Sequence, residues 1–218
     1  MLRALLFDFD GLIIDTESAI YQAWRELYAD HGHPLPVERW SQCIGTDFGA
    51  YNPKKDLEML TGKDFDWHNE EALRTQRVHE LLAGYDTLPG IRERLAEAAE
   101  LGIPCSVTSS SPLSWIELWL EKLGLRSCFA NISCRDFVEN IKPAPDIFLH
   151  AARQLDAAAH EVIIFEDSLN GLRAARAAGM KCVVVPGPTT QHLNFEGAWM
   201  KLGSLAETTV EELAEKAA

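Results

Sequence analysis

The chain has 218 residues, 47% of them hydrophobic, and a formal net charge of −13. This length and apolar content allow a substantial buried core, such as one α/β domain that carries an insertion. The acidic balance disfavours nucleic acid or an anionic membrane as a partner, because phosphate groups attract Lys and Arg.

The N-terminal segment, residues 5–15, is an apolar strand that ends in Asp8 and Asp10, with Gly11 to turn the chain. Carboxylates two residues apart on a strand emerge toward the same side, at the end of the sheet where ligands bind. Such a pair would hold Mg²⁺ and offer one carboxylate as a nucleophile. Taken alone, the pair is equally typical of a capped strand end.

Residues 16–84 carry helical patterns, with no convincing strand among them. Apolar residues recur there at helical spacing: Ile20, Trp24, Leu27, Tyr28, Leu57, Leu60, Leu73, Val78, Leu81 and Leu82. A helical insertion between the first and second core strands is therefore expected.

The core pattern resumes at residues 88–90 with Leu-Pro-Gly. Helices are predicted over 91–101, 113–123, 145–155 and 170–178, and strands over 103–108, 129–133, 162–166 and 181–185. This alternation predicts a parallel sheet with crossover helices.

Three further segments place polar groups at the starts of these helices. Ser109 lies in a hydroxyl-rich turn, which suits a phosphate or an ordinary helix cap. Lys142 precedes a proline and would by itself be solvated surface. Glu166 and Asp167 end a β-branched run before a predicted helix, where Asp167 would otherwise serve as a cap.

The tail from residue 186 is harder to interpret. A loop is predicted near residues 187–190 and a short acidic helix over 210–217. Trp199 is predicted to be a core residue. His192 has no partner at metal-ligand spacing and is expected to be a surface or hydrogen-bonded histidine.

These four segments, in this order, resemble the haloacid dehalogenase superfamily over nearly the whole chain. The family's motifs fall on Asp8 and Asp10, Ser109, Lys142, and Glu166 with Asp167. The sequences around them look like the subgroup of β-phosphoglucomutase and of sugar-phosphate and phosphoglycolate phosphatases. The resemblance implies a Rossmann-like α/β core, residues 1–15 and 86–218, with an inserted all-α cap, residues 16–85.

The resemblance also implies the chemistry. Asp8 would attack phosphorus and form an aspartyl-phosphate, while Asp10 acts as general acid and then as base. Ser109 and Lys142 would bind and stabilise the phosphoryl oxygens. Mg²⁺ would be held by Asp8, Asp10 through its backbone carbonyl, Glu166 and Asp167.

Two departures favour a phosphatase over a phosphosugar mutase. Mutases of this subgroup carry a cap histidine four residues before a tryptophan, but here Ile20 precedes Trp24. Their cap arginine has no counterpart in residues 45–48. Cap cations that could still contact substrate are Lys54, Lys55, Arg74 and Arg77. A mutase remains the alternative, and a dehalogenase or a non-catalytic binder of phosphorylated metabolites is less favoured because every catalytic group is present.

The remaining expectations concern the environment of the protein. Met1 lies close to the first strand, which leaves no room for a signal peptide, and apolar runs are shorter than the roughly 20 residues of a membrane span. Five cysteines without a Cys-x-x-Cys pattern suggest a reducing cytoplasm. The expected partner is a small phosphorylated metabolite, and the expected assembly is a monomer.

Overall fold

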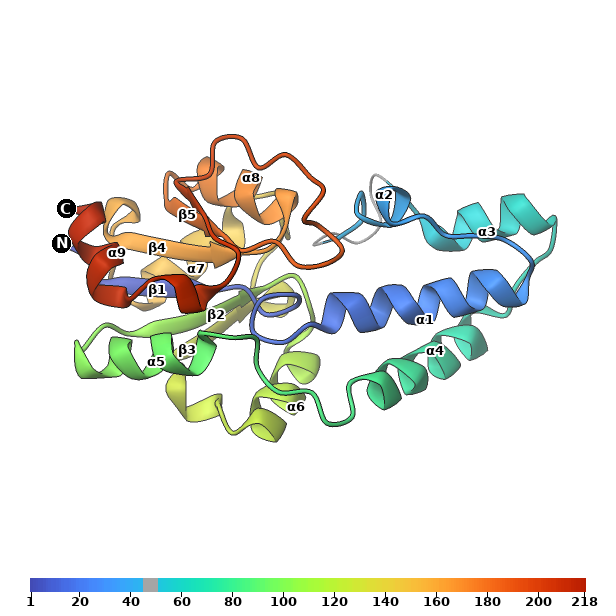
Figure 1. Ribbon diagram of the computed structural model, residues 1–218, viewed down its shortest axis with the longest axis horizontal. Helices are drawn as coiled ribbons and strands as arrows, with labels where there is room; N and C mark the ends of the chain where they lie inside the picture. The colour runs from blue at the N-terminus through green and yellow to red at the C-terminus, as the bar shows by residue number, and fades with distance from the viewer. Residues whose placement is uncertain (45–50) are drawn as a thin grey trace.

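A six-stranded parallel sheet forms the centre of the computed structural model, which describes residues 1–44 and 51–218 (Figure 1). The spatial order of the strands is β3-β2-β1-β4-β5-β6. The strands are β1 Ala4–Phe7, β2 Cys105–Ser109, β3 Asn131–Cys134, β4 Val162–Glu166, β5 Lys181–Val184 and β6 Met200–Lys201. The order reverses beside β1, so the ends of β1 and β4 flank the crevice where open α/β sheets bind ligands.

Two apolar layers cover the sheet, because alternate residues of a strand face opposite sides. Leu5 and Phe7 face one layer, and Ala4 and Leu6 face the other. The first layer is built with α5 Ile91–Glu100, α6 Leu113–Leu123 and α9 Val210–Ala217, and the second with α7 Asp146–Gln154 and α8 Leu169–Ala177. Short 3-10 turns lie at Arg126–Cys128, Arg135–Phe137, Ala159–Glu161 and Leu205–Glu207.

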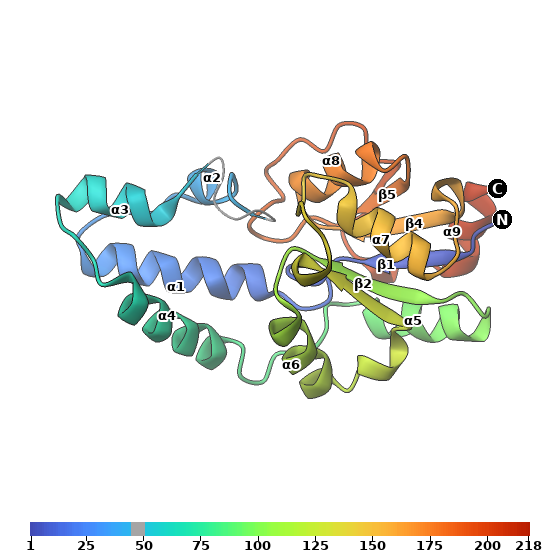
Figure 2. The same cartoon turned by 180° about the vertical axis from the view of Figure 1, so that it is seen from behind.

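In the described part of the chain between β1 and α5, four helices project from the sheet, at the end opposite the two chain termini (Figures 1 and 2). They are α1 Thr16–Asp30, α2 Val37–Trp40, α3 Pro53–Thr61 and α4 Trp67–Leu81. A separate apolar cluster that includes Trp24, Tyr28 and Leu57 holds them together. This confirms the predicted fold class, an α/β core with an inserted all-α cap, while the limits 1–15, 16–85 and 86–218 stay a prediction.

The predicted core elements agree with the structure to within two residues at each end. Helices α6 and α9 and strand β4 have the predicted bounds. Strand β6 was not predicted, because its two residues are too short to show a periodic pattern. Its neighbour Trp199 is partly buried against the first apolar layer.

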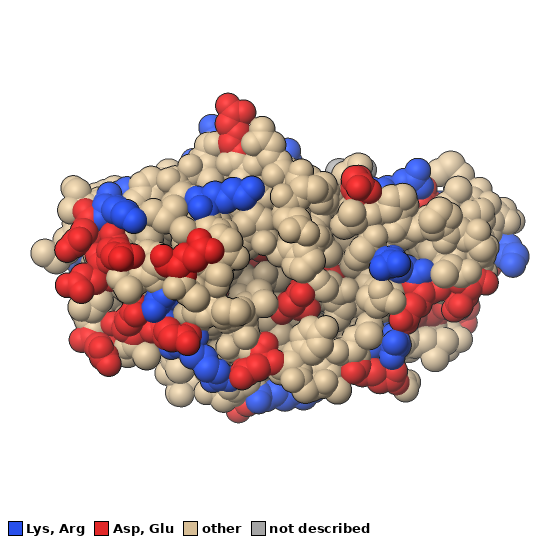
Figure 3. All heavy atoms as spheres, viewed as in Figure 1, with Lys and Arg blue, Asp and Glu red and all other residues tan. Residues whose placement is uncertain are grey.

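Within residues 1–44 and 51–218, no helix is long and apolar enough to cross a membrane. All five cysteines are free thiols. Acidic and basic side chains are interspersed on the face in Figure 3, and acidic groups gather at the end of the core formed by α5 and α9.

Candidate active site

The sheet brings the first and last sequence motifs together. Phe7 of β1 pairs with Phe165 of β4 and with Val107 of β2. The residues that follow these positions therefore meet at one edge of the sheet. Asp8 comes directly after β1, and its backbone N–H donates to the carbonyl of Phe165 at 2.9 Å.

Lys142 lies at the centre of this edge, with only 2% of its surface exposed. Its ammonium group donates to Asp8 Oδ1 at 2.6 Å, to Glu166 Oε1 at 2.5 Å and to the carbonyl of Thr108 at 2.9 Å. The predicted lysine is thus a buried partner of two predicted acids rather than a solvated surface residue.

The Glu166 carboxylate is fully buried and bonded on both oxygens. Oε1 accepts from Lys142, while Oε2 accepts from the Ser168 hydroxyl at 3.1 Å and from two backbone N–H groups, those of Asp167 and Ser168. The carboxylate also lies against Gly171, where a Cβ atom would overlap it. Glu166 is therefore held in one orientation by its surroundings.

Negative charge exceeds positive charge in this cluster. Burial, and then the charge of Glu166, raise the pKa of Asp8 to about 8, although Lys142 lowers it. Burial, and then the charge of Asp8, raise the pKa of Asp167 well above its usual value. Burial would lower the pKa of Lys142, but the Asp8 and Glu166 carboxylates raise it overall, so the lysine stays charged. One ammonium group does not neutralise the cluster.

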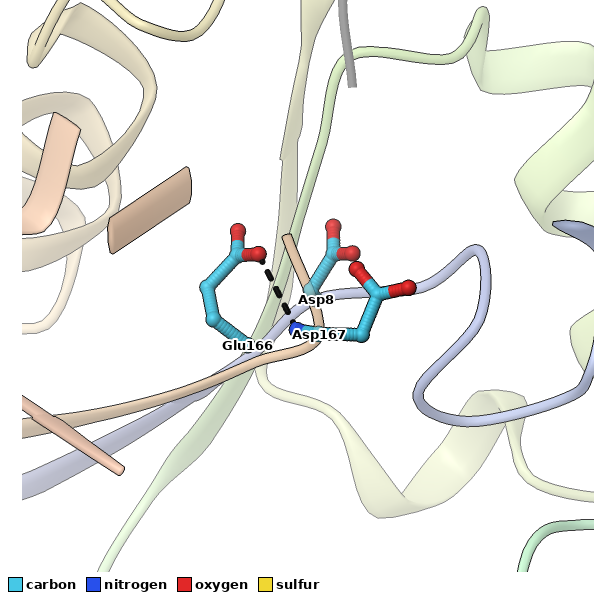
Figure 4. Close-up of side chains that lie close together, drawn as sticks. All are labelled: Asp8, Glu166 and Asp167. Atoms are coloured by element: carbon cyan, nitrogen blue, oxygen red, sulfur yellow. Dashed lines mark hydrogen bonds between the residues drawn. The ribbon is translucent and has the colours of Figure 1, made fainter. Parts of the chain in front are cut away.

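Ligand atoms of Asp8, Glu166 and Asp167 lie within 4.8 Å of one another, and Figure 4 shows the Asp8 and Asp167 carboxylates side by side. Asp167 Oδ2 is buried and has no hydrogen-bond partner among the described residues. Gly11, at φ +82°, lies so close to this oxygen that a Cβ atom would overlap it. The cluster carries more carboxylate charge than Lys142 balances, and one of its oxygens has no hydrogen-bond donor among the described residues. Carboxylate oxygens are ligands that Mg²⁺ prefers, so this arrangement fits a divalent cation such as Mg²⁺.

The Asp10 carboxylate is held by donors on both oxygens. Oδ1 accepts from the Thr16 hydroxyl at 2.6 Å and from the Trp115 indole N–H at 2.9 Å. Oδ2 accepts from the Ser111 hydroxyl at 2.6 Å and from the Ser109 hydroxyl at 3.3 Å. The structure thus brings Ser109 beside Asp10, as part of a hydroxyl-rich loop that faces the site.

A pocket of about 380 Å³ lies above these groups and is lined by residues of both the core and the cap. Core residues at its wall include Asp8, Asp10, Ser109, Ser111, Arg135, Lys142 and Asp167. Cap residues at its wall include Glu17, Ile20, Trp24, Trp40 and Arg74. The pocket is large enough for a small phosphorylated metabolite.

Among the residues that the structure describes, further polar contacts join the segment before residue 45 of the cap to the core. The Asn170 side-chain amide donates to the carbonyl of Ile44 at 2.7 Å, and Ser41 Oγ lies 3.2 Å from His192 Nε2. His192 is thus a hydrogen-bonded histidine, as predicted. The expected lack of a cation in residues 45–48 lies outside the described residues.

A comparison with protein families matches residues 5–185 to the family described as haloacid dehalogenase-like hydrolase. The chain belongs to this family. Among curated relatives, YhcW of Bacillus subtilis is 40% identical over 95% of this chain and 94% of its own length. The fructose-1-phosphate phosphatase YqaB of Escherichia coli is 32% identical over 83% of this chain and 95% of its own length.

A solved relative in the same family is CbbY from Rhodobacter sphaeroides, crystallised with phosphate and, as a mutant, with xylulose-(1,5)bisphosphate. The phosphate complex is 32% identical, with a TM-score of 0.78, and the match covers 98% of this chain and 99% of that one. The fold and the suggested subgroup are thereby confirmed.

Sequence reasoning missed several side chains of this haloacid dehalogenase-like site. Thr16, Ser111 and Trp115 bind Asp10, and Glu17 reaches the pocket. Thr16 and Glu17 are the first residues of the predicted insertion, which is the one signal that pointed to them. Nothing in the sequence indicated that Trp115, in the first turn of a core helix, would reach Asp10.

Proposed function

We propose that this protein is a magnesium-dependent phosphatase that hydrolyses a sugar phosphate through an aspartyl-phosphate at Asp8. The observation that carries the proposal is the buried cluster in which Lys142 contacts both Asp8 and Glu166 beside the unpaired oxygen of Asp167. Membership of the haloacid dehalogenase-like hydrolases and the phosphatase relatives support it.

Each side chain has a role that its position supports. Asp8 attacks phosphorus in line, and the leaving oxygen departs with a proton from Asp10. Asp10 then accepts a proton from the water that attacks the aspartyl-phosphate, which releases phosphate and frees Asp8. Lys142 stabilises charge on the phosphoryl oxygens, and Ser109 donates a hydrogen bond to them.

The residues that would hold Mg²⁺ are Asp8, Asp167 and the backbone carbonyl of Asp10, with Glu166 directly or through water. When bound, the ion supplies positive charge that offsets repulsion between the carboxylates and the incoming phosphate. Glu166, with both oxygens already bonded, also keeps Lys142 in place.

The upper part of the pocket supports a substrate that carries hydroxyl groups. Glu17 is 8% exposed, lines the pocket, and has a buried Oε2 with no partner among the described residues. Burial, and then the charges of Asp10 and Asp8, raise its pKa well above the usual value. A sugar hydroxyl would satisfy this group. Among the described residues, Arg74 and Arg135 line the same pocket and form no ion pair, which suits a second anionic group.

Hydrolysis is favoured over transfer to a second hydroxyl. Ile20, at the position where the mutase pattern requires histidine, lines the pocket and offers no hydrogen bond or proton to a substrate. Water can therefore accept the phosphoryl group without any additional side chain in the pocket.

The test is phosphate release from a panel of sugar phosphates, phosphoglycolate and nucleotides, with Mg²⁺ or with EDTA. The panel includes β-glucose 1-phosphate with its bisphosphate activator and a coupled assay for glucose 6-phosphate. Magnesium-dependent release without isomerised product is expected. Isomerised product with little free phosphate would make the protein a mutase, and no turnover of any substrate would refute the proposal.

The covalent step is tested with Asp8→Asn. An acid quench during turnover of a radiolabelled substrate should leave label on the wild-type chain and none on this variant, which should also release no phosphate. Asp30→Asn, at an exposed position of α1, removes the same charge far from the site and should keep both properties. A fully active Asp8→Asn variant would exclude this mechanism.

A further inference from the structure

The side chain of Trp115 connects the core helix α6 to Asp10. Its indole N–H donates to Asp10 Oδ1 at 2.9 Å. The other donors to Asp10 are hydroxyl groups, which rotate, whereas an indole N–H is a donor fixed in the plane of a large ring. Trp115 therefore defines the direction of this carboxylate more firmly than its other partners do.

Trp115 contacts Asp10 from outside the pocket. Asp10, Ser109 and Ser111 line the pocket, but Trp115 is not among the described residues of its wall. It would touch neither the substrate nor the reacting atoms. Any effect of Trp115 on turnover must then pass through Asp10.

The ring of Trp115 is held by an aromatic cluster that spans the cap and the core. His79, in the last turn of α4, has its ring centroid 5.6 Å from those of both Trp115 and Trp119. The two indole rings meet edge to face at 5.7 Å. Both ribbon views place the end of α4 next to α6 (Figures 1 and 2). A shift of the cap would therefore move a ring that packs directly on Trp115.

We propose that Trp115 is a positioning residue that aims the Asp10 carboxyl at the leaving oxygen, and that His79 of the cap sets the place of Trp115. This inference rests on the proposed function, since it assigns Asp10 the proton transfer. Proton transfer by a placed side chain contributes about 10²–10⁴-fold to a rate. Misplacing a reacting group by about 1 Å costs on the order of 10²-fold.

The chain offers a matched pair of variants for a test. Trp115→Phe and Trp119→Phe remove the same indole nitrogen and keep an aromatic ring. The Trp119 Nε1 atom is buried without a hydrogen-bond partner among the described residues, so only the first variant breaks a bond to Asp10.

The readout is kcat/KM for the best sugar phosphate divided by kcat/KM for p-nitrophenyl phosphate. An alkoxide leaving group needs a proton from Asp10, whereas p-nitrophenolate needs little help. Trp115→Phe should lower this ratio by about tenfold or more, a part of the full general-acid effect. Trp119→Phe should keep the wild-type ratio, because general damage to the site lowers kcat/KM for both substrates by the same factor.

His79→Leu keeps the indole donor but removes the aromatic contact from the cap. It should lower the same ratio, by less than Trp115→Phe does. If circular dichroism shows that Trp115→Phe is unfolded, the ratio in His79→Leu tests the inference. A wild-type ratio in either Trp115→Phe or His79→Leu, or an equal fall in Trp119→Phe, would overturn the inference. A wild-type enzyme that hydrolyses neither substrate would instead refute the proposed function.

Discussion

Replacing Lys142 by Met tests how much the charge of this lysine stabilises the buried acid cluster. Met has a similar length but no charge, so it keeps the packing and removes three contacts, to Asp8, Glu166 and the Thr108 carbonyl. All of these groups are buried: Asp8 is 6% exposed and Glu166 is fully enclosed. The variant would thus leave these buried carboxylates without a counter-charge.

The expected loss of stability follows from this burial. Removing one partner of a buried ion pair typically costs about 3–5 kcal/mol, because the other charge stays buried and uncompensated. In a chain of this size, 1 kcal/mol shifts Tm by about 2–4 °C. The free energy of unfolding should then fall by about 3 kcal/mol or more, with a Tm at least about 6 °C lower.

Thermal unfolding in EDTA, monitored by circular dichroism, measures the effect without bound metal. Lys63→Met, at an exposed position, is the matched control and should change stability by less than about 0.5 kcal/mol. The double variant Lys142→Met/Glu166→Gln should recover part of the lost stability, because it also removes the Glu166 charge that the loss of Lys142 leaves uncompensated. A single Lys142→Met variant as stable as the wild type would refute this account of the cluster.

Three further predictions concern the same edge of the sheet. Mg²⁺ at about 100 times its Kd should stabilise the wild type against thermal unfolding by about 2.7 kcal/mol, and Asp167→Asn should lose most of this gain. Equal stabilisation of the two proteins would show that Asp167 is not a metal ligand. Gly171→Ala, which in a free helix would stabilise by up to about 1 kcal/mol, should destabilise here because its Cβ overlaps the Glu166 carboxylate, as urea unfolding would reveal. Gly11→Ala, strained at φ +82° and overlapping Asp167 Oδ2, should lower Tm and weaken the response to Mg²⁺; an unchanged response would contradict the close approach of Gly11.

The core was predictable because its signals are local. Strands β1 and β4 are short apolar runs, and the polar groups Asp8, Ser109 and Glu166 lie at or just after the ends of β1, β2 and β4. A parallel sheet brings these ends to one edge whatever the lengths of the connections. Local order along the chain was therefore enough to place the motifs near one another.

The environment of each group was not predictable in the same way. The sequence around Lys142 shows a lysine between an irregular segment and a proline, which gives no sign that its ammonium group is buried 2.6 Å from Asp8. The pKa of Asp8, raised to about 8, depends on burial and on Glu166, which is 158 residues away in the sequence. Such properties arise only from the packing of distant segments.

The contacts of Asp10 also could not be predicted from the local sequence. Its donors come from the start of α1, from the end of β2 with the loop that follows it, and from α6, and the first of these lies about 90 residues from the others in the sequence. The Asp-x-Asp motif fixes the position of Asp10 in the sequence, but its carboxylate is held jointly by Thr16 at the start of the insertion and by side chains of the core. Variation in the cap would therefore alter proton transfer as well as the choice of substrate, even where all the sequence motifs are kept.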